Sequence, residues 1–415
     1  MRVLVLTQYF HPEVTAVTFR LHPLASGLAQ RGHEVELICE IPSYPGGRVH
    51  RGYGGKALIR RNVDGVHVHH VWNRATPIET LPARLSTYAI YASAATAVGA
   101  TRARPDVILA SSPPLPVAAA AALLARRFRA PWILDVRDLW PAVAGALGEM
   151  PSTRALQLAA ALERWLYRDA AAVTTVTEPF VDHVARQADR EKVHLLPNGT
   201  TEMWLGVGAD EVGKDEVALP PDRFVWTYAG NVGLSQDLGT AVEAARMLGD
   251  GYQLLILGEG TTRRRLIEQA GELAGSEVAF RDVVPTDEAA RIMRASDALL
   301  VPLAANPELG KTIPVKLYDC CALGRPVVVA APGESSRLAR EQGIGVEVAP
   351  GDPGALAAAV RRLSSDRTLA ERVSARAREF AGGHLREQQV SPLEAVLEGV
   401  IERRGTRPPA ATPLR

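Results

Sequence analysis

The segment richest in residues that could do chemistry is NPELGKTIPVKLYDCCALGRPV, residues 306–327. It holds Lys311 and Lys316, the only two lysines after residue 217, in a chain where five of 47 basic residues are lysines. Lys316 and Asp319 are three residues apart, which places them on one face of a helix. The lysines could neutralise a diphosphate, and the carboxylate could accept hydrogen bonds from the hydroxyls of a ribose. A solvated ion pair between Lys316 and Asp319 is the alternative interpretation.

Two strand-to-helix junctions could hold the same ligand. In YAGNVGLSQDL (228–238), Gly230 and Gly233 let backbone N–H groups approach a phosphate at a helix N-terminus, with Asn231 and Gln236 in the same turn. In LGEG (257–260), Glu259 is a candidate polar contact. Alternatively, the two glycines serve only the packing of helix against strand, and Glu259 caps a helix.

Other possible sites carry weaker signals. Asp138 ends the strand-like run DVRD and could orient an acceptor hydroxyl, or it could cap a helix or pair with Arg137. His67, His69 and His70 alternate on one predicted strand, where ordinary packing is favoured over metal binding. The sequence contains no DxD, HExxH, CxxC or GxSxG motif, which disfavours metal-dependent transferases, zinc proteases and serine hydrolases.

The elements that must position these residues alternate between strand and helix along the chain. Strands are predicted at 3–9, 33–40, 65–72, 106–113, 131–141, 172–177, 223–230, 252–260, 277–284, 298–303 and 325–331, with helical patterns between most of them. This alternation predicts an α/β protein of two Rossmann-like, doubly wound parallel-sheet domains. Such sheets bind ligands at the carboxyl ends of their strands, so we expect the site in the cleft between the domains.

The predicted organisation has five parts. They are an N-terminal domain at 1–199, an acidic linker at 200–222, a C-terminal domain at 223–380, a helix at 381–404 that packs back toward the N-terminal domain, and a disordered tail at 405–415.

Composition excludes several protein classes. The 415 residues are 47% hydrophobic and 22% charged, which excludes fibrous, collagen-like and wholly disordered proteins. A net charge of +1 gives no general attraction to nucleic acid. Three cysteines and a strand-like N-terminus indicate a reducing compartment and no signal peptide, so we expect a cytoplasmic protein. The uncharged segment 85–100 is too short and too weakly apolar to span a bilayer.

Several motifs in register resemble a known family. In the N-terminal domain these motifs are RGHEVELI, IPSYPGG (41–47), ASSPP (110–114) and DVRDLWP (135–141). At the domain junction and beyond it they are LPNG (196–199), LGEGTTRRRL, FRDVVPTDE, ASDALLVPL and the segment ending ALGRPVV. Together they resemble the GT-B glycosyltransferases of family GT4, in the branch of O-antigen and capsule transferases of the L-fucosamine transferase type. The resemblance covers about residues 1–400.

The resemblance implies a retaining transferase that uses a nucleotide-diphosphate sugar, most simply a UDP-sugar, without a metal or another cofactor. It implies a saccharide or polyprenyl-linked acceptor in cell-surface polysaccharide synthesis, bound to the N-terminal domain. The donor set it suggests is Gly230, Asn231, Gly233, Gln236, Glu259, Val283, Lys316, Leu317 and Asp319.

The chain departs from the family pattern at charged positions. Lys311 stands where the first acid of the donor motif is expected, and Asn231 and Gln236 replace the usual Arg and Lys. The first loop, 13–20, lacks glycine. Positive charge for the diphosphate must then come from Lys311, Lys316 and either Arg20 or Arg264. With Asp138 for the acceptor hydroxyl, the predicted catalytic residues are Lys311, Asp138 and Arg20.

Other functions stay open at this point. A UDP-sugar 2-epimerase shares the predicted architecture, and the missing acid at position 311 would also suit a non-catalytic nucleotide-sugar-binding protein. A transferase that decorates a soluble natural product is a variant of the main prediction.

A membrane contact is also predicted. Segment 48–61 contains five basic residues, Arg48, Arg51, Lys56, Arg60 and Arg61, and no acid. Tyr88 and Tyr91, in the uncharged segment 85–100, would share a helical face beside it. The expectation is peripheral docking on anionic lipid, with an ordinary solvated surface as the alternative.

Overall fold

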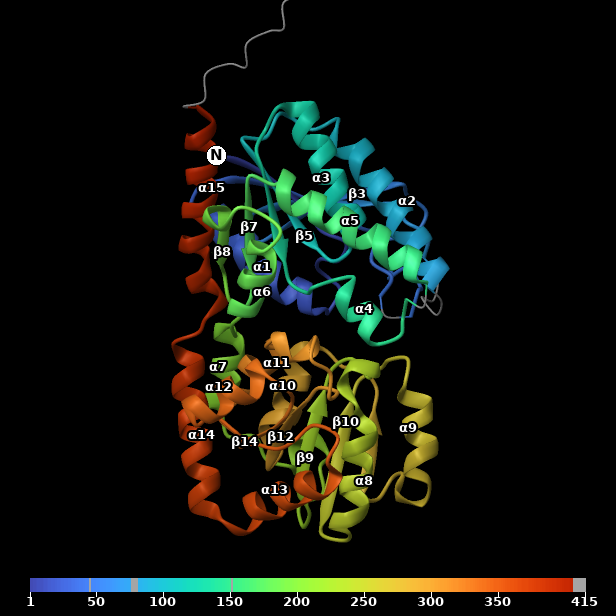
Figure 1. The fold of residues 1–415 in the computed structure, drawn as a ribbon. Helices are drawn as coiled ribbons and strands as arrows, with labels where there is room; N and C mark the ends of the chain where they lie inside the picture. The colour runs from blue at the N-terminus through green and yellow to red at the C-terminus, as the bar shows by residue number, and fades with distance from the viewer. Residues whose placement is uncertain (45, 76–80, 151, 406–415) are drawn as a thin grey trace, which may run out of the picture. The chain divides into compact units, whose positions relative to one another are not determined.

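The computed structural model describes residues 1–44, 46–75, 81–150 and 152–405, which form two compact units (Figure 1). The N-terminal unit contains Met1–Pro197 and the chain from Glu387 onward, and the C-terminal unit contains Asn198–Arg386. Each unit is described by itself below.

The N-terminal unit is built on an eight-stranded sheet in the order β3-β4-β2-β1-β5-β6-β7-β8. Its strands are β1 (Arg2–Leu6), β2 (Glu34–Glu40), β3 (Leu58–Val63), β4 (Val66–Val71), β5 (Val107–Ser112), β6 (Trp132–Val136), β7 (Ala172–Thr175) and β8 (Val193–Leu195). Neighbouring strands are parallel except for the antiparallel pair β3 and β4.

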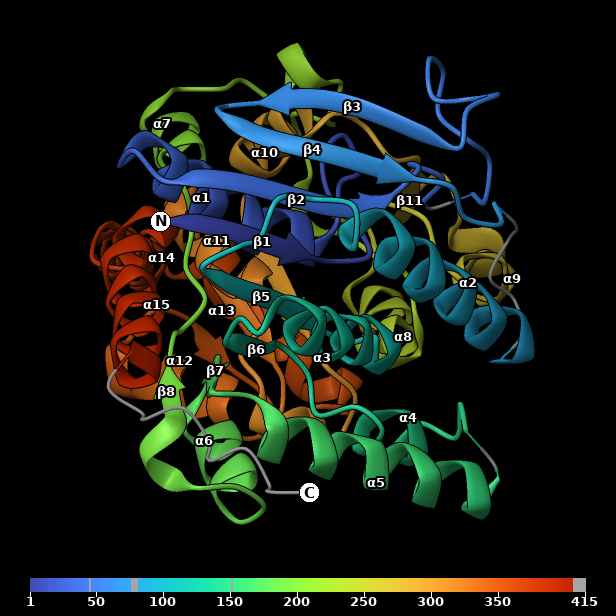
Figure 2. The same ribbon diagram turned by 90° about the horizontal axis from the view of Figure 1, so that it is seen from above.

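Helices cover both faces of this sheet (Figure 2). They are α1 (Ala16–Gln30), α2 (Leu81–Gly99), α3 (Leu115–Phe128), α4 (Ala142–Ala146), α5 (Thr153–Asp169), α6 (Glu178–Ala185) and α15 (Val390–Gly405). Within β1, Leu4 and Leu6 join the core under α2, α3 and α5, while Val3 and Val5 join the core under α1 and α15. The strand is continuously apolar because both of its faces are buried.

The last helix, α15, belongs to the N-terminal unit although it ends the described chain. Its Glu394 accepts hydrogen bonds from Arg31 and His33, and its Val390 packs against Gly27 of α1, where a side chain on the glycine would collide. The tail expected at 405–415 lies outside the described residues apart from residue 405, which ends α15.

The C-terminal unit is built on a six-stranded parallel sheet in the order β11-β10-β9-β12-β13-β14. Its strands are β9 (Phe224–Ala229), β10 (Tyr252–Leu257), β11 (Val278–Arg281), β12 (Ala298–Pro302), β13 (Val327–Ala330) and β14 (Val346–Glu347). The sheet order reverses between β9 and β12, which is where doubly wound sheets place their ligands.

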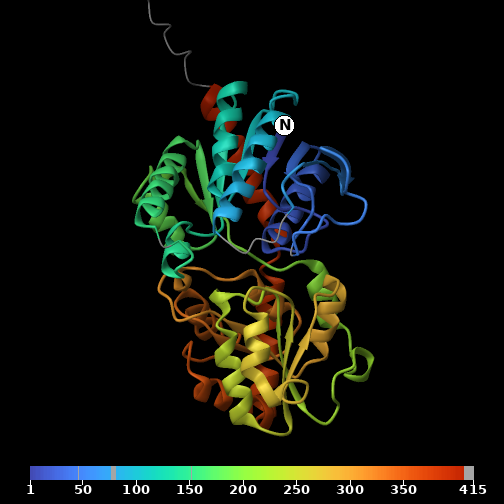
Figure 3. The same ribbon diagram turned by 90° about the vertical axis from the view of Figure 1, so that its right-hand side faces the viewer.

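The helices of this unit also cover both faces of their sheet. They are α7 (Glu202–Ala209), α8 (Leu238–Leu248), α9 (Arg263–Ala270), α10 (Thr286–Ala295), α11 (Val315–Ala322), α12 (Glu334–Gln342), α13 (Pro353–Ser365) and α14 (Arg367–Gly382). Helices α8 and α9, drawn in yellow tones in Figure 3, lie side by side and pack with α13 on one face; α7, α10, α11 and α12 pack on the other.

Two segments differ from the sequence-based expectation. The expected linker at 200–222 contains helix α7, whose Trp204 is buried in the core of the C-terminal unit. Gly206 and Gly208 weaken its helical pattern, yet Gly208 is needed because a Cβ there would collide with the carbonyl of Ala322. The second difference is strand β3, which forms the sheet edge from part of the basic segment 48–61.

Helix α2 does not supply the aromatic surface expected from Tyr88 and Tyr91. Tyr91 is fully buried, and its hydroxyl donates to the carbonyls of Thr7 and Ile38. The two tyrosines therefore do not form an exposed pair, and the expected docking face on segment 85–100 is wrong in this respect. Over the described part of the chain, no helix has the length and apolar character needed to cross a membrane.

Candidate functional site

The ammonium of Lys316 is the most unusual group in the C-terminal unit. Helix α11 begins at Val315, directly after Pro314, so Lys316 lies in its first turn. Its Nζ is buried and lies 3.6 Å from the centre of the Tyr228 ring. Among the described residues, Nζ has no hydrogen-bond partner. Burial lowers the pKa of Lys316 to about 7, against the opposing influence of Cys320 and Asp319.

Gly230 lies directly beside this ammonium. It follows β9 with a φ of +134°, a conformation that L side chains rarely adopt. A Cβ at this position would lie 2.8 Å from Lys316 Nζ, so only glycine lets the ammonium approach the backbone. Gly230 and Asn231 are exposed, which leaves the outer side of this turn open to a ligand.

Hydrogen bonds to neighbouring strands and loops fix the turn after β9. Gly230 N donates to Leu257 O (2.9 Å), and Val232 N donates to Glu259 O (2.8 Å). The Tyr228 hydroxyl donates to Asn231 O (2.5 Å). The ring that contacts Lys316 therefore also holds the turn, so charge and backbone are positioned together.

Gln236 and Gly233 interact with each other. Gln236 Oε1 accepts from Gly233 N (3.1 Å), and Gln236 Nε2 donates to Ser235 Oγ (3.1 Å). The Gly233 N–H, which we expected to approach a phosphate, is thus occupied by a side chain of its own loop.

The other donor-site residues on the β10 and β11 side are more exposed. Glu259 lies 3.3 Å from Arg263, which also pairs with Asp282 (2.9 Å). Val283 has 49% of its surface exposed. The Arg264 side chain is 94% exposed and lies 3.7 Å from Glu268.

Asp319 differs from the expected ribose ligand. Its residue surface is only 5% exposed, and Oδ1 accepts from Thr200 Oγ1 (3.0 Å) and Arg386 Nη2 (2.8 Å). The carboxylate therefore ties α11 to two distant segments of the same unit. Leu317 is fully buried in the core, so its side chain packs in the core and lines no open site.

Lys311 ends a short 3-10 helix and forms an ion pair with Glu308 (2.6 Å). This partner partly neutralises the charge that we expected at the diphosphate. The sequence did not indicate the pair, although the three-residue spacing of Glu308 and Lys311 permits it.

Arg20, in the N-terminal unit, is a structural residue and not an available cation. Its Nη2 and Nε donate to both carboxylate oxygens of Asp135 (2.7 and 3.0 Å), and it also donates to the carbonyls of Leu196 and Pro197. Both members of the pair are buried. Burial favours the neutral acid, but Arg20 and Thr174 hold the pKa of Asp135 below its ordinary value. The pairing with Asp135 gives Arg20 a structural role, and its catalytic role stays a prediction.

Asp138 lies in the loop after β6 and is exposed. The neighbouring Arg137 donates to Ser111 Oγ (2.7 Å) and to the Pro113 carbonyl (2.6 Å), so its guanidinium is held against the loop after β5. Asp138 thus remains a possible contact for an acceptor hydroxyl.

The sequence analysis missed two buried carboxyl groups in the N-terminal unit. Glu13 Oε1 accepts from the backbone N–H groups of Ser43 and Tyr44 (both 2.8 Å), and Glu40 Oε2 accepts from Gln8 and Asn73. Burial raises the pKa of Glu13 to about 7 and, with a further contribution from Glu13, that of Glu40 to about 8.

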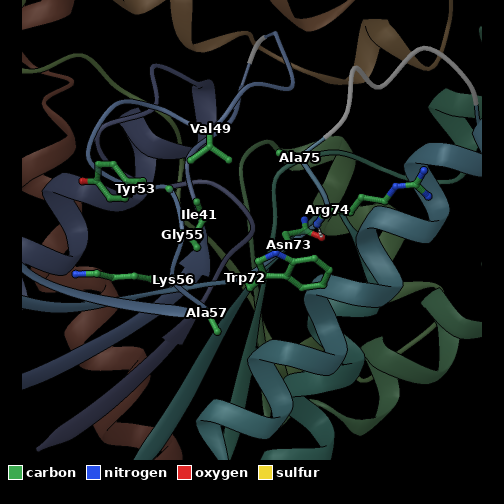
Figure 4. Close-up of a pocket in the computed structure, with 11 residues that line it drawn as sticks. Ile41, Val49, Tyr53, Gly55, Lys56, Ala57, Trp72, Asn73, Arg74 and Ala75 are labelled. Carbon is green, nitrogen blue, oxygen red and sulfur yellow. Dashed lines mark hydrogen bonds between the residues drawn. The ribbon is translucent and has the colours of Figure 1, made fainter.

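An open hollow on the same unit is lined in part by Asn73, which donates to Glu40 (Figure 4). Its volume is about 620 Å³, and it is lined by Ile41, Val49, Tyr53, Gly54, Gly55, Lys56, Ala57, Trp72, Asn73, Arg74 and Ala75. Trp72 lines the hollow and is 52% exposed, and the side chains of Lys56 and Arg74 extend to opposite sides of the view. An exposed indole face is a suitable surface for a sugar ring.

Of the three strand histidines, His69 and His70 are buried and His67 is exposed. His69 Nε2 lies 2.9 Å from Glu36, and His70 Nδ1 lies 3.2 Å from Cys39 Sγ. Searching only the described residues, we find no group of three or more His, Cys, Asp or Glu residues placed to hold a metal ion.

Each of the two units matches a protein-family model. Residues 15–199 match the model described as "Glycosyl transferase 4-like domain", and residues 211–380 match "Glycosyl transferases group 1". The chain belongs to the GT-B glycosyltransferases of family GT4. The two matched segments contain the Lys316 site and the hollow beside Trp72.

Two known relatives match most of this glycosyltransferase. The Escherichia coli protein WcaI, named for colanic acid biosynthesis and glycosyl transfer, is 26% identical over 406 residues, covering 94% of this chain and 98% of that one. The 2-deoxystreptamine N-acetyl-D-glucosaminyltransferase of Streptomyces fradiae is 28% identical over 363 residues, covering 80% and 81%.

Solved structures share the fold. Sucrose-phosphate synthase from Thermosynechococcus elongatus has a TM-score of 0.70 at 18% identity, covering 97% of this glycosyltransferase and 98% of that chain. Anabaena HepE in complex with UDP and glucose has a TM-score of 0.69 at 14% identity, covering 96% and 100%.

Proposed function

We propose that this glycosyltransferase is a retaining enzyme that transfers a sugar from a nucleotide diphosphate, most simply a UDP-sugar, to a saccharide or lipid-linked saccharide in cell-surface polysaccharide synthesis. The observation that carries the donor part is the buried ammonium of Lys316 beside Gly230, at the point where the sheet order reverses. A buried charge without a partner is costly, and a diphosphate would supply the missing counter-charge.

The chemistry follows from this placement. As the sugar–phosphate bond breaks, negative charge grows on the departing diphosphate, and Lys316 with the first N–H groups of α11 would stabilise it. The acceptor oxygen bonds to the anomeric carbon on the face that the diphosphate leaves, and the acceptor proton passes to a leaving phosphate oxygen. No side-chain nucleophile and no metal ion take part in this scheme.

UDP as the nucleotide is supported by the HepE structures, which contain UDP, UDP with glucose, and UDP-glucose. Their sequence identity to this chain is only 13–14%, so they support the proposal through the shared fold. WcaI, which matches nearly the whole chain, supports a polysaccharide acceptor.

The acceptor part of the proposal rests on the N-terminal unit. The hollow offers the exposed indole of Trp72, and Asp138 offers an exposed carboxylate. A lipid-linked acceptor would keep the enzyme at a membrane surface, so the proposal includes peripheral contact with an anionic membrane and a cytoplasmic location.

A second candidate acceptor is a soluble aminocyclitol or related natural product. It is favoured by the Streptomyces fradiae relative, which is named for 2-deoxystreptamine. The match covers four fifths of each chain.

The test is a thermal-shift panel of nucleotide sugars, followed by product analysis with and without acceptor. A ligand that binds only the folded state raises the melting temperature. We expect the largest shift with a UDP-sugar, and a product with retained anomeric configuration only when acceptor is present. Interconversion of the nucleotide sugar without acceptor would show an epimerase, and binding without turnover would show a non-catalytic binding protein; either outcome contradicts the proposal.

A further inference from the structure

Helix α5 presents two large apolar side chains to solvent. Leu158 is 73% exposed and Trp165 is 40% exposed, and their separation of seven residues places them on one face of the helix. The opposite face already packs in the core through Leu166 and Tyr167, which are 0% and 1% exposed. The outer pair therefore contributes nothing to the core of the unit.

Helix α3 extends this apolar surface. The guanidinium of Arg126 lies 5.2 Å from the centre of the Trp165 ring, and Arg126 also donates to Asp169 (2.6 Å). Both helices follow neighbouring parallel strands, so they run in the same direction, and Figures 1 and 2 show them side by side. Leu123, 56% exposed and one turn before Arg126, then lies toward the Leu158 end of α5. We call Leu123, Leu158 and Trp165, with the arginines around them, the α3–α5 face.

The charges on the α3–α5 face are almost all positive. Helices α3 and α5 contain two acids: Glu163, which is buried and accepts from Tyr167, and Asp169, which accepts from Arg126 and Trp132. Four further arginines of the two helices are exposed: Arg127, Arg154, Arg164 and Arg168.

We propose that the α3–α5 face is the surface by which this enzyme rests on a bilayer containing anionic lipid. The inference rests on the membrane contact in the proposed function and assigns it to residues outside the basic segment 48–61. Leu123 and Leu158 enter the acyl boundary, Trp165 lies at headgroup level, and the arginines contact lipid phosphates.

The positive charge of the α3–α5 face disfavours a second copy of this chain as its partner. In a two-fold contact the same patch meets itself, so the arginines of one α3–α5 face would approach those of the other. A negatively charged lipid surface matches both the apolar centre and the basic rim.

The test is co-sedimentation of the full chain with large vesicles of phosphatidylcholine alone or with phosphatidylglycerol, at low and high salt. We expect binding to the mixed vesicles that weakens in salt. Leu158→Asp should lower the partition coefficient about tenfold or more, because it replaces an inserted apolar side chain with a charge. Met247→Asn, which changes a residue 51% exposed on the C-terminal unit, is the matched control and should bind like the parent.

A second readout keeps the test independent of one substitution. Brominated lipid should quench the parent's tryptophan fluorescence, and Trp165→Phe should lose most of that quenching. The inference is overturned if the parent ignores anionic vesicles at low salt. It is also overturned if binding survives Leu158→Asp but is lost in Arg60→Ser/Arg61→Ser on β3, or if light scattering shows a dimer that Leu158→Asp dissociates. UDP binding by thermal shift, measured on every variant, reports the proposed function separately.

Discussion

The Nζ of Lys316 lies 3.6 Å from the centre of the Tyr228 ring and has no hydrogen-bond partner among the described residues. A desolvated cation–π contact contributes about 2 kcal/mol, whereas removing an ammonium from water costs several kcal/mol. The ligand-free site therefore disfavours the charged lysine, which is why its pKa falls to about 7. A bound diphosphate would reverse this balance.

The first prediction concerns pH. The pKa of Lys316 is lower in the folded protein than its ordinary value of 10.5, so between pH 7 and 10.5 the unfolded chain binds a proton that the folded chain does not. The contribution of Lys316 to the free energy of unfolding therefore increases as pH rises through this window. Because a diphosphate favours the charged form, UDP binding should take up close to one proton near pH 8.5.

Isothermal titration calorimetry in buffers of different ionisation enthalpy measures this uptake. The Lys316→Met variant keeps the length of the side chain but cannot take up the proton, so its binding heat should not depend on the buffer. Buffer-independent heat in the parent would contradict the role given to Lys316.

A second prediction concerns the Arg20–Asp135 pair. Arg20→Ala leaves a buried carboxylate without its partner and should lower the free energy of unfolding by about 3–5 kcal/mol. The double change Arg20→Met/Asp135→Leu removes both charges and should cost clearly less. Urea unfolding followed by circular dichroism distinguishes the two. If Arg20→Ala keeps full stability and loses only transfer activity, the residue is catalytic after all.

A third prediction separates stability from ribose recognition at Asp319. Asp319→Ala removes the acceptor of Thr200 and Arg386, so we expect a loss of about 3–5 kcal/mol in the stability of the C-terminal unit. The ratio of affinities for UDP and 2′-deoxy-UDP should stay as in the parent, provided that the variant is folded at the assay temperature. If Asp319→Ala keeps the stability of the parent but binds UDP and 2′-deoxy-UDP equally well, Asp319 does contact the ribose.

The features that could be predicted from the sequence are those set by local pattern. Alternating apolar runs and glycine-containing turns predicted the two doubly wound sheets, because each strand and helix carries its own periodicity. The same holds for Lys316 and Gly230, since a lysine in the first turn of a helix and a glycine after a strand are visible in short segments.

The rest depends on pairing between distant residues. Arg20 and Asp135 are 115 residues apart, and Thr200 and Asp319 are 119 apart, so no local pattern shows that each pair is buried together. For the same reason Glu13 and Glu40 read as ordinary charges. Helix α7 was missed because eight residues with two internal glycines give too short a pattern.

The central claim is that Lys316 binds the diphosphate of the donor, and calorimetry of Lys316→Ala with UDP and with uridine tests it most directly. Loss of one charge-assisted hydrogen bond should weaken UDP binding by about 1.5–3 kcal/mol and leave uridine binding unchanged. Arg264→Ala, at an exposed cation of the same unit, should bind both ligands like the parent. Equal losses for UDP and uridine in Lys316→Ala, or no loss for either, would contradict the account.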